Sequence, residues 1–335
     1  MAPNSGHAPV AFAGSPTGQG EYDGPRSVRP GRTLADRVYR GAATGGGVLT
    51  LVLLVLIGWF LFQQGRPALT KEGWHFVTGS QWTAVGPFGI WAIMYWTIVI
   101  ALIGLALALP LSIAMALFIN EYAPPSTRRL FTSLVDLLAA VPSLIYGLWG
   151  LLFLQPHLLG VAKWLTTHLA FIPIFQTSAP QFKASSFIAG VVVALMIVPI
   201  ITSITREVFS QAPPGEKEAA LAMGATRWGM IRTVVLPYGK GGVIGGAMLG
   251  LGRALGETIV VVLIISPSYE VSRHILQSGS NSVASLIALQ INDAHGIAVN
   301  ALMAAGLALF VTTLLVNMVA AVIVGRSRSG RGTEI

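Results

Sequence analysis

Six long apolar stretches constrain the fold of this chain more than any other feature of its sequence. Each is long enough to cross the hydrocarbon core of a bilayer, which takes about 20 helical residues. Only 10% of the residues are charged, against about 25% in an ordinary soluble domain. Water could not solvate such a surface, so the composition predicts an all-α membrane protein with six transmembrane helices. The predicted spans are about residues 44–64, 91–119, 130–155, 185–206, 242–266 and 298–324.

The positions of Lys and Arg predict the orientation of these spans. With the N-terminus inside, the cytoplasmic segments hold 15 of the 21 Lys and Arg residues and the outer loops hold 5. Cytoplasmic loops of membrane proteins carry the excess of basic residues, so we expect both the N- and the C-terminus in the cytoplasm. An aromatic belt at the outer membrane interface, rather than a binding site, is expected from Trp74, Trp82, Trp91 and Trp96.

The same pattern predicts the domain organisation. Residues 1–43 are basic and rich in Gly, Pro and Ser, and we expect a disordered cytoplasmic tail there. A six-span domain follows at 44–324, and residues 325–335 form a short cytoplasmic tail. A basic flank before an apolar run is also typical of a signal peptide. No small-residue cleavage site follows this one, so we expect an uncleaved first span.

Several function classes are excluded by what the sequence lacks. There is no cysteine, and the six histidines form no close-spaced ligand set, so neither a metal site nor a cofactor is expected. No P-loop is present, because Gly239 and Lys240 have no glycine five positions before them. No set of nucleophile and base suggests catalytic residues. The net charge of +8 reflects membrane topology and does not indicate a nucleic-acid partner.

The loop at 211–240, between the fourth and fifth spans, is predicted to form two short helices. Glu218 lies near the start of the first helix, where a carboxylate suits the positive end of the helix dipole. Gly224 is placed to end that helix. A second helical piece, at about 227–235, is expected to stop before Leu236 and Pro237. From these features alone, the loop is either a docking element or a pair of amphipathic helices resting on lipid.

Two charged residues in the fifth span are candidates for a substrate path. Arg253 lies roughly 16 Å into this span, near the middle of the hydrocarbon core. A charge there costs at least about 2.5–3.5 kcal/mol. Glu257 follows at i+4, which is within ion-pair reach on one helix face. Arg253 therefore either faces a path for an anion or forms a self-neutralised pair with Glu257, and the two readings are compatible.

Polar and small residues mark two further features of the spans. Asp136, in the third span, is expected to pair with a cation of a neighbouring subunit or to line a polar pocket. Pro142 is expected to kink the same helix. Gly242, Gly246 and Gly250 recur every four residues in the fifth span, a pattern that lets another helix approach closely.

The loop resembles a known element once its spacing is written out. The spacing E-A-A-x3-G-x9-V-x-L-P is similar to that of the cytoplasmic coupling loop of ABC-importer permeases, and it is formed by Glu218, Ala219, Ala220, Gly224, Val234, Leu236 and Pro237. Two more segments, VPSLIYGLWG at 141–150 and GRALGET at 252–258, resemble the permeases of the bacterial high-affinity phosphate importer. The sister permeases of PstA type have related motifs, but Leu148 and Trp149 favour the PstC type.

This resemblance implies a fold, a location and a set of partners. It implies a binding-protein-dependent transport system inner-membrane component with a type I ABC importer permease fold, in the bacterial cytoplasmic membrane. The partners would be a PstA-type permease, two ATPase subunits, the lipid bilayer and an extracytoplasmic phosphate-binding protein, and inorganic phosphate would be the substrate. The implied ATPase-coupling residues are Glu218, Ala219, Ala220, Gly224, Leu236 and Pro237, and the substrate path would include Arg253, Glu257 and Asp136.

The expected function is therefore a non-catalytic permease subunit of an ATP-driven phosphate importer. The alternative is a secondary anion transporter that is not coupled to an ATPase; such transporters more often show inverted repeats and about ten or more spans. The sequence leaves phosphate against arsenate open.

Overall fold

The computed structural model describes residues 34–83, 85–177 and 181–327 and contains helices but no strand among them. Six helical runs are long and apolar enough to cross a membrane. They are Asp36–Glu72, Trp91–Tyr122, Ser143–His168, Ser186–Ser210, Arg227–Leu255 and Ile297–Ile323. The predicted all-α class with six transmembrane helices is therefore confirmed.

The helices are α1 (Leu34–Glu72), α2 (His75–Thr78), α3 (Trp91–Leu117), α4 (Pro125–Ala140), α5 (Ser143–Trp149), α6 (Gln155–His168), α7 (Ser186–Ser210), α8 (Pro214–Ala222), α9 (Arg227–Met230), α10 (Leu236–Leu255), α11 (Ile259–Ile264), α12 (Val283–Gln290) and α13 (Ile297–Ser327). Three π-helical turns, η1 (Phe118–Tyr122), η2 (Gly150–Leu154) and η4 (Ile231–Val235), and a 3-10 turn, η3 (Pro173–Phe175), lie between them.

The chain forms two compact units, Met1–Leu54 and Val55–Ile335. In the first unit, the described residues are the first part of α1. The predicted tail at 1–43 lies outside the described residues except for 34–43, which are helical. The C-terminal tail lies outside them from residue 328 onward, and residues 325–327 continue α13.

Helix α7 forms the centre of the second unit. Its residues Ile188, Val193, Ile197 and Ile201 are fully buried, and α3 and α10 pack along it. Glycine allows the close approach of α10, because a Cβ at Gly250 would lie 2.7 Å from Cδ1 of Ile201. Gly242 and Gly246 also face α7. The close helix packing predicted from the repeated glycines is confirmed.

The third predicted span, 130–155, is not one helix. α4 ends at Ala140, Val141 and Pro142 are extended, and α5 begins at Ser143. The helix breaks because proline lacks an amide hydrogen and disfavours the helical conformation in the residue before it. The kink predicted at Pro142 is a complete break, and the membrane-spanning run starts after it. Asp136 therefore lies on α4, outside the run that can span a membrane.

The fifth predicted span, 242–266, is also broken. α10 ends at Leu255 and α11 begins at Ile259, with Gly256, Glu257 and Thr258 between them. Glycine is a poor helix former, and the side chain of Glu257 accepts a hydrogen bond from the amide of Val260 at 3.2 Å. That bond satisfies one of the free amides at the start of α11.

The helix after the loop begins earlier than predicted. The prediction that the second helical piece ends before Leu236 and Pro237 is wrong, because α9, η4 and α10 form one continuous run. The Leu236 amide bonds to the carbonyl of Ile231, five residues back. This wide turn accommodates Pro237, whose ring would clash with a carbonyl in a regular α-helix.

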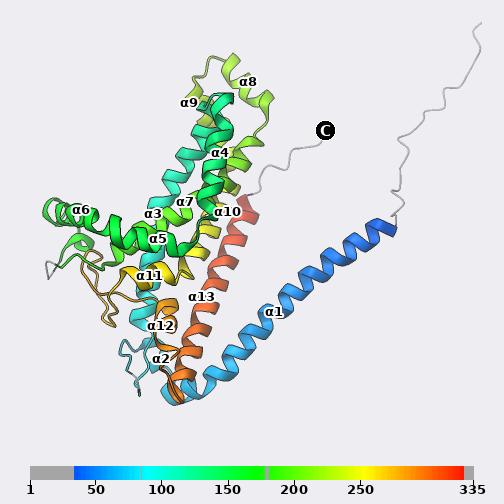
Figure 1. Cartoon of the computed structure of the whole chain (residues 1–335). Coiled ribbons are helices and arrows are strands. Elements are labelled where there is room, and N and C mark those ends of the chain that lie inside the picture. The colour runs from blue at the N-terminus through cyan, green and yellow to red at the C-terminus, as the bar shows by residue number, and fades with distance from the viewer. Residues whose placement is uncertain (1–33, 84, 178–180, 328–335) are drawn as a thin grey trace, which may run out of the picture. The chain divides into compact units, whose positions relative to one another are not determined.

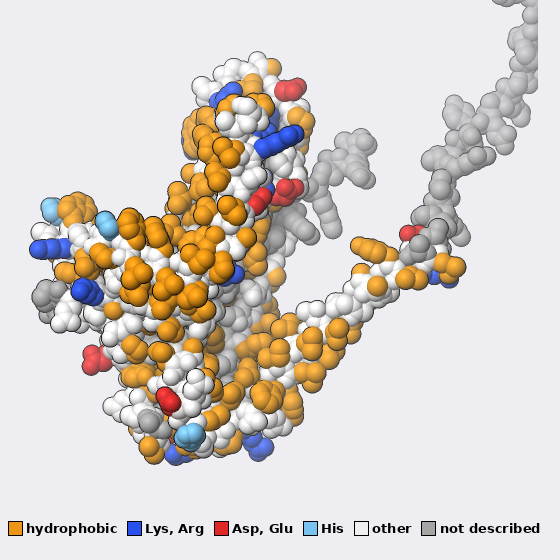
Figure 2. All heavy atoms as spheres, in the orientation of Figure 1, with side chains coloured by type: hydrophobic (Ala, Val, Ile, Leu, Met, Phe, Trp, Pro, Cys, Tyr) orange, Lys and Arg blue, Asp and Glu red, His pale blue; other side chains and the backbone are white. Residues whose placement is uncertain are grey.

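Loop elements lie at the two ends of the second unit. α8 and α9 are at one end, and α2 and α12 are at the other (Figure 1). Hydrophobic side chains cover much of the face between these ends (Figure 2). At the end formed by α2 and α12, Trp82 and Trp96 are buried, whereas Trp74 and Trp91 are exposed. The predicted aromatic belt is therefore wrong for Trp82 and Trp96, which are core residues.

Candidate functional site

The loop between α7 and α10 folds into two short helices joined by a tight turn. α8 ends with a Schellman motif, in which the Gly224 amide bonds to the Leu221 carbonyl at 3.0 Å and the Ala225 amide to the Ala220 carbonyl at 3.1 Å. Gly224 has a φ of +85°, which favours glycine. The Thr226 side chain then caps α9 by accepting a bond from the Gly229 amide. Gly224 ends the first helix as predicted.

The loop has a buried side and an exposed side. Ala220 packs in an apolar cluster with Phe209 of α7, Leu117 of α3 and Met230 of α9. Glu218, Ala219, Gly224 and Pro237 are exposed, and Leu236 is half-buried. The large apolar side chains of Leu221, Met223 and Trp228 are also exposed. The loop is thus anchored on the helix ends while an apolar and acidic face remains uncovered within the chain.

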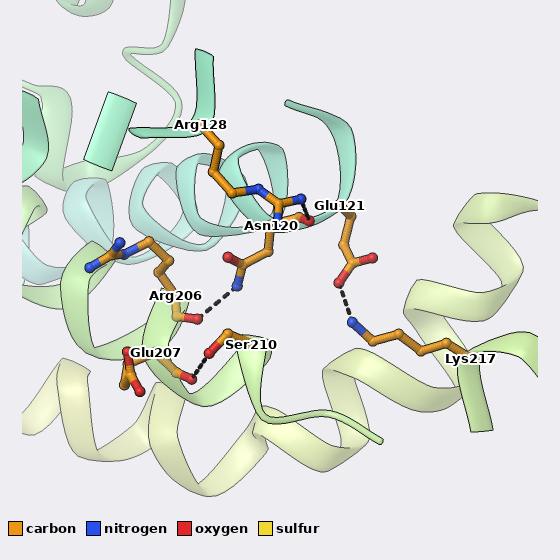
Figure 3. Close-up of polar contacts among 7 residues, drawn as sticks. All are labelled: Asn120, Glu121, Arg128, Arg206, Glu207, Ser210 and Lys217. Carbon is orange, nitrogen blue, oxygen red and sulfur yellow. Dashed lines mark hydrogen bonds and ion pairs between the residues drawn. The ribbon is translucent and has the colours of Figure 1, made fainter. Parts of the chain in front are cut away.

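Polar contacts that the sequence analysis missed join the helices beside the loop to one another and, through Lys217, to the loop (Figure 3). Glu121, in η1, pairs with Lys217 of α8 at 2.6 Å. Asn120 donates to the carbonyl of Arg206 on α7 at 2.7 Å, and Arg128 of α4 donates to the carbonyl of Asn120 at 2.6 Å. The sequence signal was present, since Glu121 is the first charged residue after the uncharged stretch from Gly73 to Asn120.

Asp136 belongs to this same polar network. Its carboxylate lies 3.9 Å from Nη2 of Arg206, and its side chain is 51% exposed. Nη1 of Arg206 donates to the hydroxyl of Thr132 on α4 at 2.9 Å. Asp136 thus has a cation partner within its own chain, on the helix that leads into the loop.

Arg253 and Glu257 lie at the break between α10 and α11, but they do not pair. Among the described residues, no carboxylate lies within 4.0 Å of the Arg253 guanidinium. Glu257 is 8% exposed and binds the Val260 amide, whereas Arg253 is exposed. The i+4 geometry fails because α10 ends at Leu255, between the two residues.

The two helix breaks are brought together by packing between α5 and α11. A Cβ on Gly147 of α5 would lie 2.8 Å from Cδ1 of Leu263 and 3.4 Å from Cα of Val260. The Tyr146 hydroxyl of α5 donates to the Leu138 carbonyl of α4 across the other break, at 2.9 Å. An exposed cation thus stands where two interrupted helices meet, an arrangement that suits an anionic ligand.

A separate cleft is less suited to an anion than the break that carries Arg253. It has a volume of about 740 Å³ and is lined by Ser80, Gln81, Ser268, Tyr269, Glu270 and Val271. Its charged lining residue is a carboxylate. Burial raises the pKa of the Tyr269 hydroxyl above its ordinary value of 10.0, so this group is a neutral hydrogen-bonding group near pH 7. Groups of three or more metal-ligating side chains are absent from the described residues.

Comparison with known proteins decides the family. The model of the family described as "Binding-protein-dependent transport system inner membrane component" matches residues 108–329. The chain belongs to this family. It is a multi-pass protein of the cytoplasmic membrane and a permease component of a transport system, as the sequence predicted.

Named relatives cover almost the whole chain. The "Phosphate transport system permease protein PstC 2" of Mycobacterium tuberculosis is 38% identical over 310 residues, which cover 90% of this chain and 95% of the relative. The "Phosphate transport system permease protein PstC" of Xylella fastidiosa is 37% identical over 301 residues, which cover 89% of this chain and 92% of the relative.

The fold is also found in a solved transporter. A chain in the crystal structure of a bacterial ABC transporter involved in the import of the acidic polysaccharide alginate matches with a TM-score of 0.54. The match covers 87% of this chain and 99% of that chain, at 20% sequence identity. The chain therefore has the fold of an ABC-importer permease.

Proposed function

We propose that this chain is the PstC-type permease subunit of an ATP-driven importer of inorganic phosphate. Its relatives at 37–38% identity are phosphate transport system permeases. The single structural observation that carries the substrate proposal is the guanidinium of Arg253 at the α10–α11 break, which is exposed and has no carboxylate of the described residues within 4.0 Å. Phosphate bears between one and two negative charges near neutral pH, and the donor fork of arginine fits its oxygens.

Glu257 has a separate role in this proposal. Since it is buried and bound to the Val260 amide, it supports the break that presents Arg253. Because no carboxylate in the described part of the chain neutralises Arg253, this residue attracts an anion. One cation alone gives weak enough binding for phosphate to leave the path.

The force for transport enters at the end of the molecule formed by α8 and α9 (Figure 1). The exposed face of the α8–α9 loop, with Glu218, Ala219, Gly224 and Leu221, is the docking surface for an ATPase subunit. Ala220 and Leu236 fix this surface on the helix ends, and Pro237 sets the wide turn into α10. The complete importer contains a PstA-type permease, two ATPase subunits and an extracytoplasmic phosphate-binding protein. Both termini and this loop lie in the cytoplasm.

Reconstitution tests the proposal directly. The purified complex in proteoliposomes should take up radiolabelled phosphate only with ATP and the loaded binding protein. Sulfate should not compete, whereas arsenate, with the same charge and shape, should. ATP-independent uptake by this chain alone would favour the secondary anion transporter instead. Uptake of another solute in place of phosphate would contradict the substrate proposal.

A further inference from the structure

Three consecutive residues of η1, the π-helical turn that follows α3, contact other helices. Asn120 bonds to the Arg206 carbonyl of α7 and accepts a bond from Arg128 of α4. The next residue, Glu121, pairs with Lys217 of α8. The third, Tyr122, lies beneath Arg227 of α9, whose Cζ is 5.8 Å from the ring centroid. One short segment, residues 120–122, therefore joins α3 to four other helices.

The ion pair between Glu121 of this segment and Lys217 of α8 is well shielded from water. The Glu121 side chain is 9% exposed and the Lys217 side chain is 20% exposed. Separating this pair would cost free energy, because each charge would be left shielded from water without its partner. The Arg206–Asp136 pair nearby is longer and more exposed, so it constrains the helices much less.

The local backbone supports a special role for the segment. Residues Phe118–Tyr122 form a π-helical turn, a geometry that occurs often at functional sites. The turn widens the end of α3, and Ala123 and Pro124 after it are extended. The side chains of Asn120, Glu121 and Tyr122 can thus reach toward α7, α8 and α9 from one turn.

We propose that the 120–122 segment is the joint through which displacement of the coupling loop moves the membrane helices. Glu121 and Lys217 are positioning residues. They fix α8 to α3, and Asn120 passes the movement to α4 and α7. The proposal rests on the function proposed above, because it assumes that a partner displaces α8. It predicts that α8, the end of α3 and the start of α4 move as one rigid body.

A charge swap in the assembled importer tests the joint. Glu121→Lys and Lys217→Glu should each lower phosphate uptake by about tenfold or more, since each places two like charges together. The double swap Glu121→Lys/Lys217→Glu should recover uptake to within about threefold of wild type, because it restores an opposite pair. Glu207→Lys is the matched control: it makes the same change at an exposed carboxylate whose side chain bonds only to Gln211 among its described contacts. It should leave uptake near wild type.

A distance measurement separates this proposal from the substrate proposal. The chain has no cysteine, so spin labels can be placed at the exposed positions Ala222 of α8 and Arg129 of α4. In the complex, their distance distribution should stay narrow and unchanged through the ATP cycle, and Lys217→Glu should broaden it. This readout does not require phosphate. If wild-type complex shows ATP-independent uptake or none, the proposed function fails while the label distances still judge the joint.

Three results would overturn this proposal. They are wild-type phosphate uptake by the single swaps, no recovery of uptake by the double swap, and a label-distance distribution that stays narrow in Lys217→Glu. Glu121→Gln covers the case in which the single swaps do not assemble, because it keeps the acceptor and the side-chain volume. It should broaden the distribution and lower uptake by several fold. A distribution identical to wild type in this variant would equally overturn the proposal.

Discussion

The end of the molecule formed by α8 and α9 differs from the break between α10 and α11 in whether its charged side chains have partners within the chain. At the end formed by α8 and α9, Glu121 is paired with Lys217 and Arg206 with Asp136, so these charged side chains have partners within the chain. At the break, Glu257 is buried against a backbone amide while Arg253 is exposed and, among the described residues, has no carboxylate partner. In the function proposed above, the first region holds helices together and the second takes its ligand from outside the chain.

This difference separates transmission of force from recognition. Paired charges in a shielded setting fix geometry, because moving one partner leaves the other unsatisfied. An exposed arginine keeps its hydrogen-bonding capacity for a ligand. In an importer, the first kind of site suits the attachment of a moving loop, and the second suits a substrate path.

The largest effect should come from Arg253. Arg253→Gln is expected to lower phosphate uptake by about 100-fold, because a charge-assisted hydrogen bond is worth roughly 1.5–3 kcal/mol. ATP hydrolysis and assembly should persist. Uptake in proteoliposomes and purification of the complex measure the two properties. Arg129→Gln makes the same change at an exposed cation of α4 and should transport normally. Normal uptake by Arg253→Gln would remove the contrast between the two regions.

Replacements of Glu257 sharpen the contrast by separating charge from hydrogen bonding. Glu257→Ala leaves the Val260 amide without its partner, so it should destabilise the complex by about 1–3 kcal/mol. Glu257→Gln keeps an acceptor oxygen, so its free energy of unfolding should lie within about 0.5 kcal/mol of the wild-type value. Thermal unfolding in detergent compares them. Equal destabilisation by both variants would mean that the charge of Glu257 matters and that an ion pair with Arg253 forms in the importer.

Gly224 tests whether the exposed face of the loop awaits a partner. Apart from its two chain neighbours, no described residue has an atom within 4 Å of a Cβ placed there, so only the φ of +85° opposes a side chain. Gly224→Ala and Gly224→Trp should both destabilise the isolated chain by about 1 kcal/mol. Only Gly224→Trp should block co-purification of the ATPase subunit and stop transport. If both variants transport equally well, no partner covers this position.

The smallest effect should come from Asp136. Asp136→Asn removes a half-exposed partner 3.9 Å from Arg206, and such pairs contribute about 0–1 kcal/mol. Stability should change by less than about 0.5 kcal/mol, and uptake by less than twofold. A loss as large as that of Arg253→Gln would place Asp136 in the substrate path, as the sequence suggested.

The sequence predicted the features that depend on composition and local pattern. Six apolar runs, the end of α8 at Gly224 and the glycine face of α10 follow from hydrophobicity and from the conformational freedom of glycine. The family was equally accessible, since its motifs are contiguous at 218–237 and 252–258. These properties involve neighbours in sequence.

The sequence did not predict where the apolar runs break or which charges meet. A window of 20 residues averages the polar residues at 256–258, and Pro142, with their apolar neighbours, so it cannot tell a broken helix from a continuous one. The pairing of Glu121 with Lys217 joins residues 96 positions apart, and only the packing of α8 on α3 creates it. The i+4 pairing of Arg253 with Glu257 failed for the same reason, because it assumed an unbroken helix.

The π-helical turn η4 has a consequence for how the protein tolerates insertions and deletions. A π turn contains one residue more than an α turn, and each helical residue rotates the following side chains by about 100°. Deleting one residue in this turn would convert it into an α turn and leave Arg253 on the same side of α10, whereas a deletion in the regular part of α10 before Arg253 would rotate that residue by about 100°. In this turn, the helix can lose one residue without changing the direction in which the arginine points, and in α10 before Arg253 it cannot.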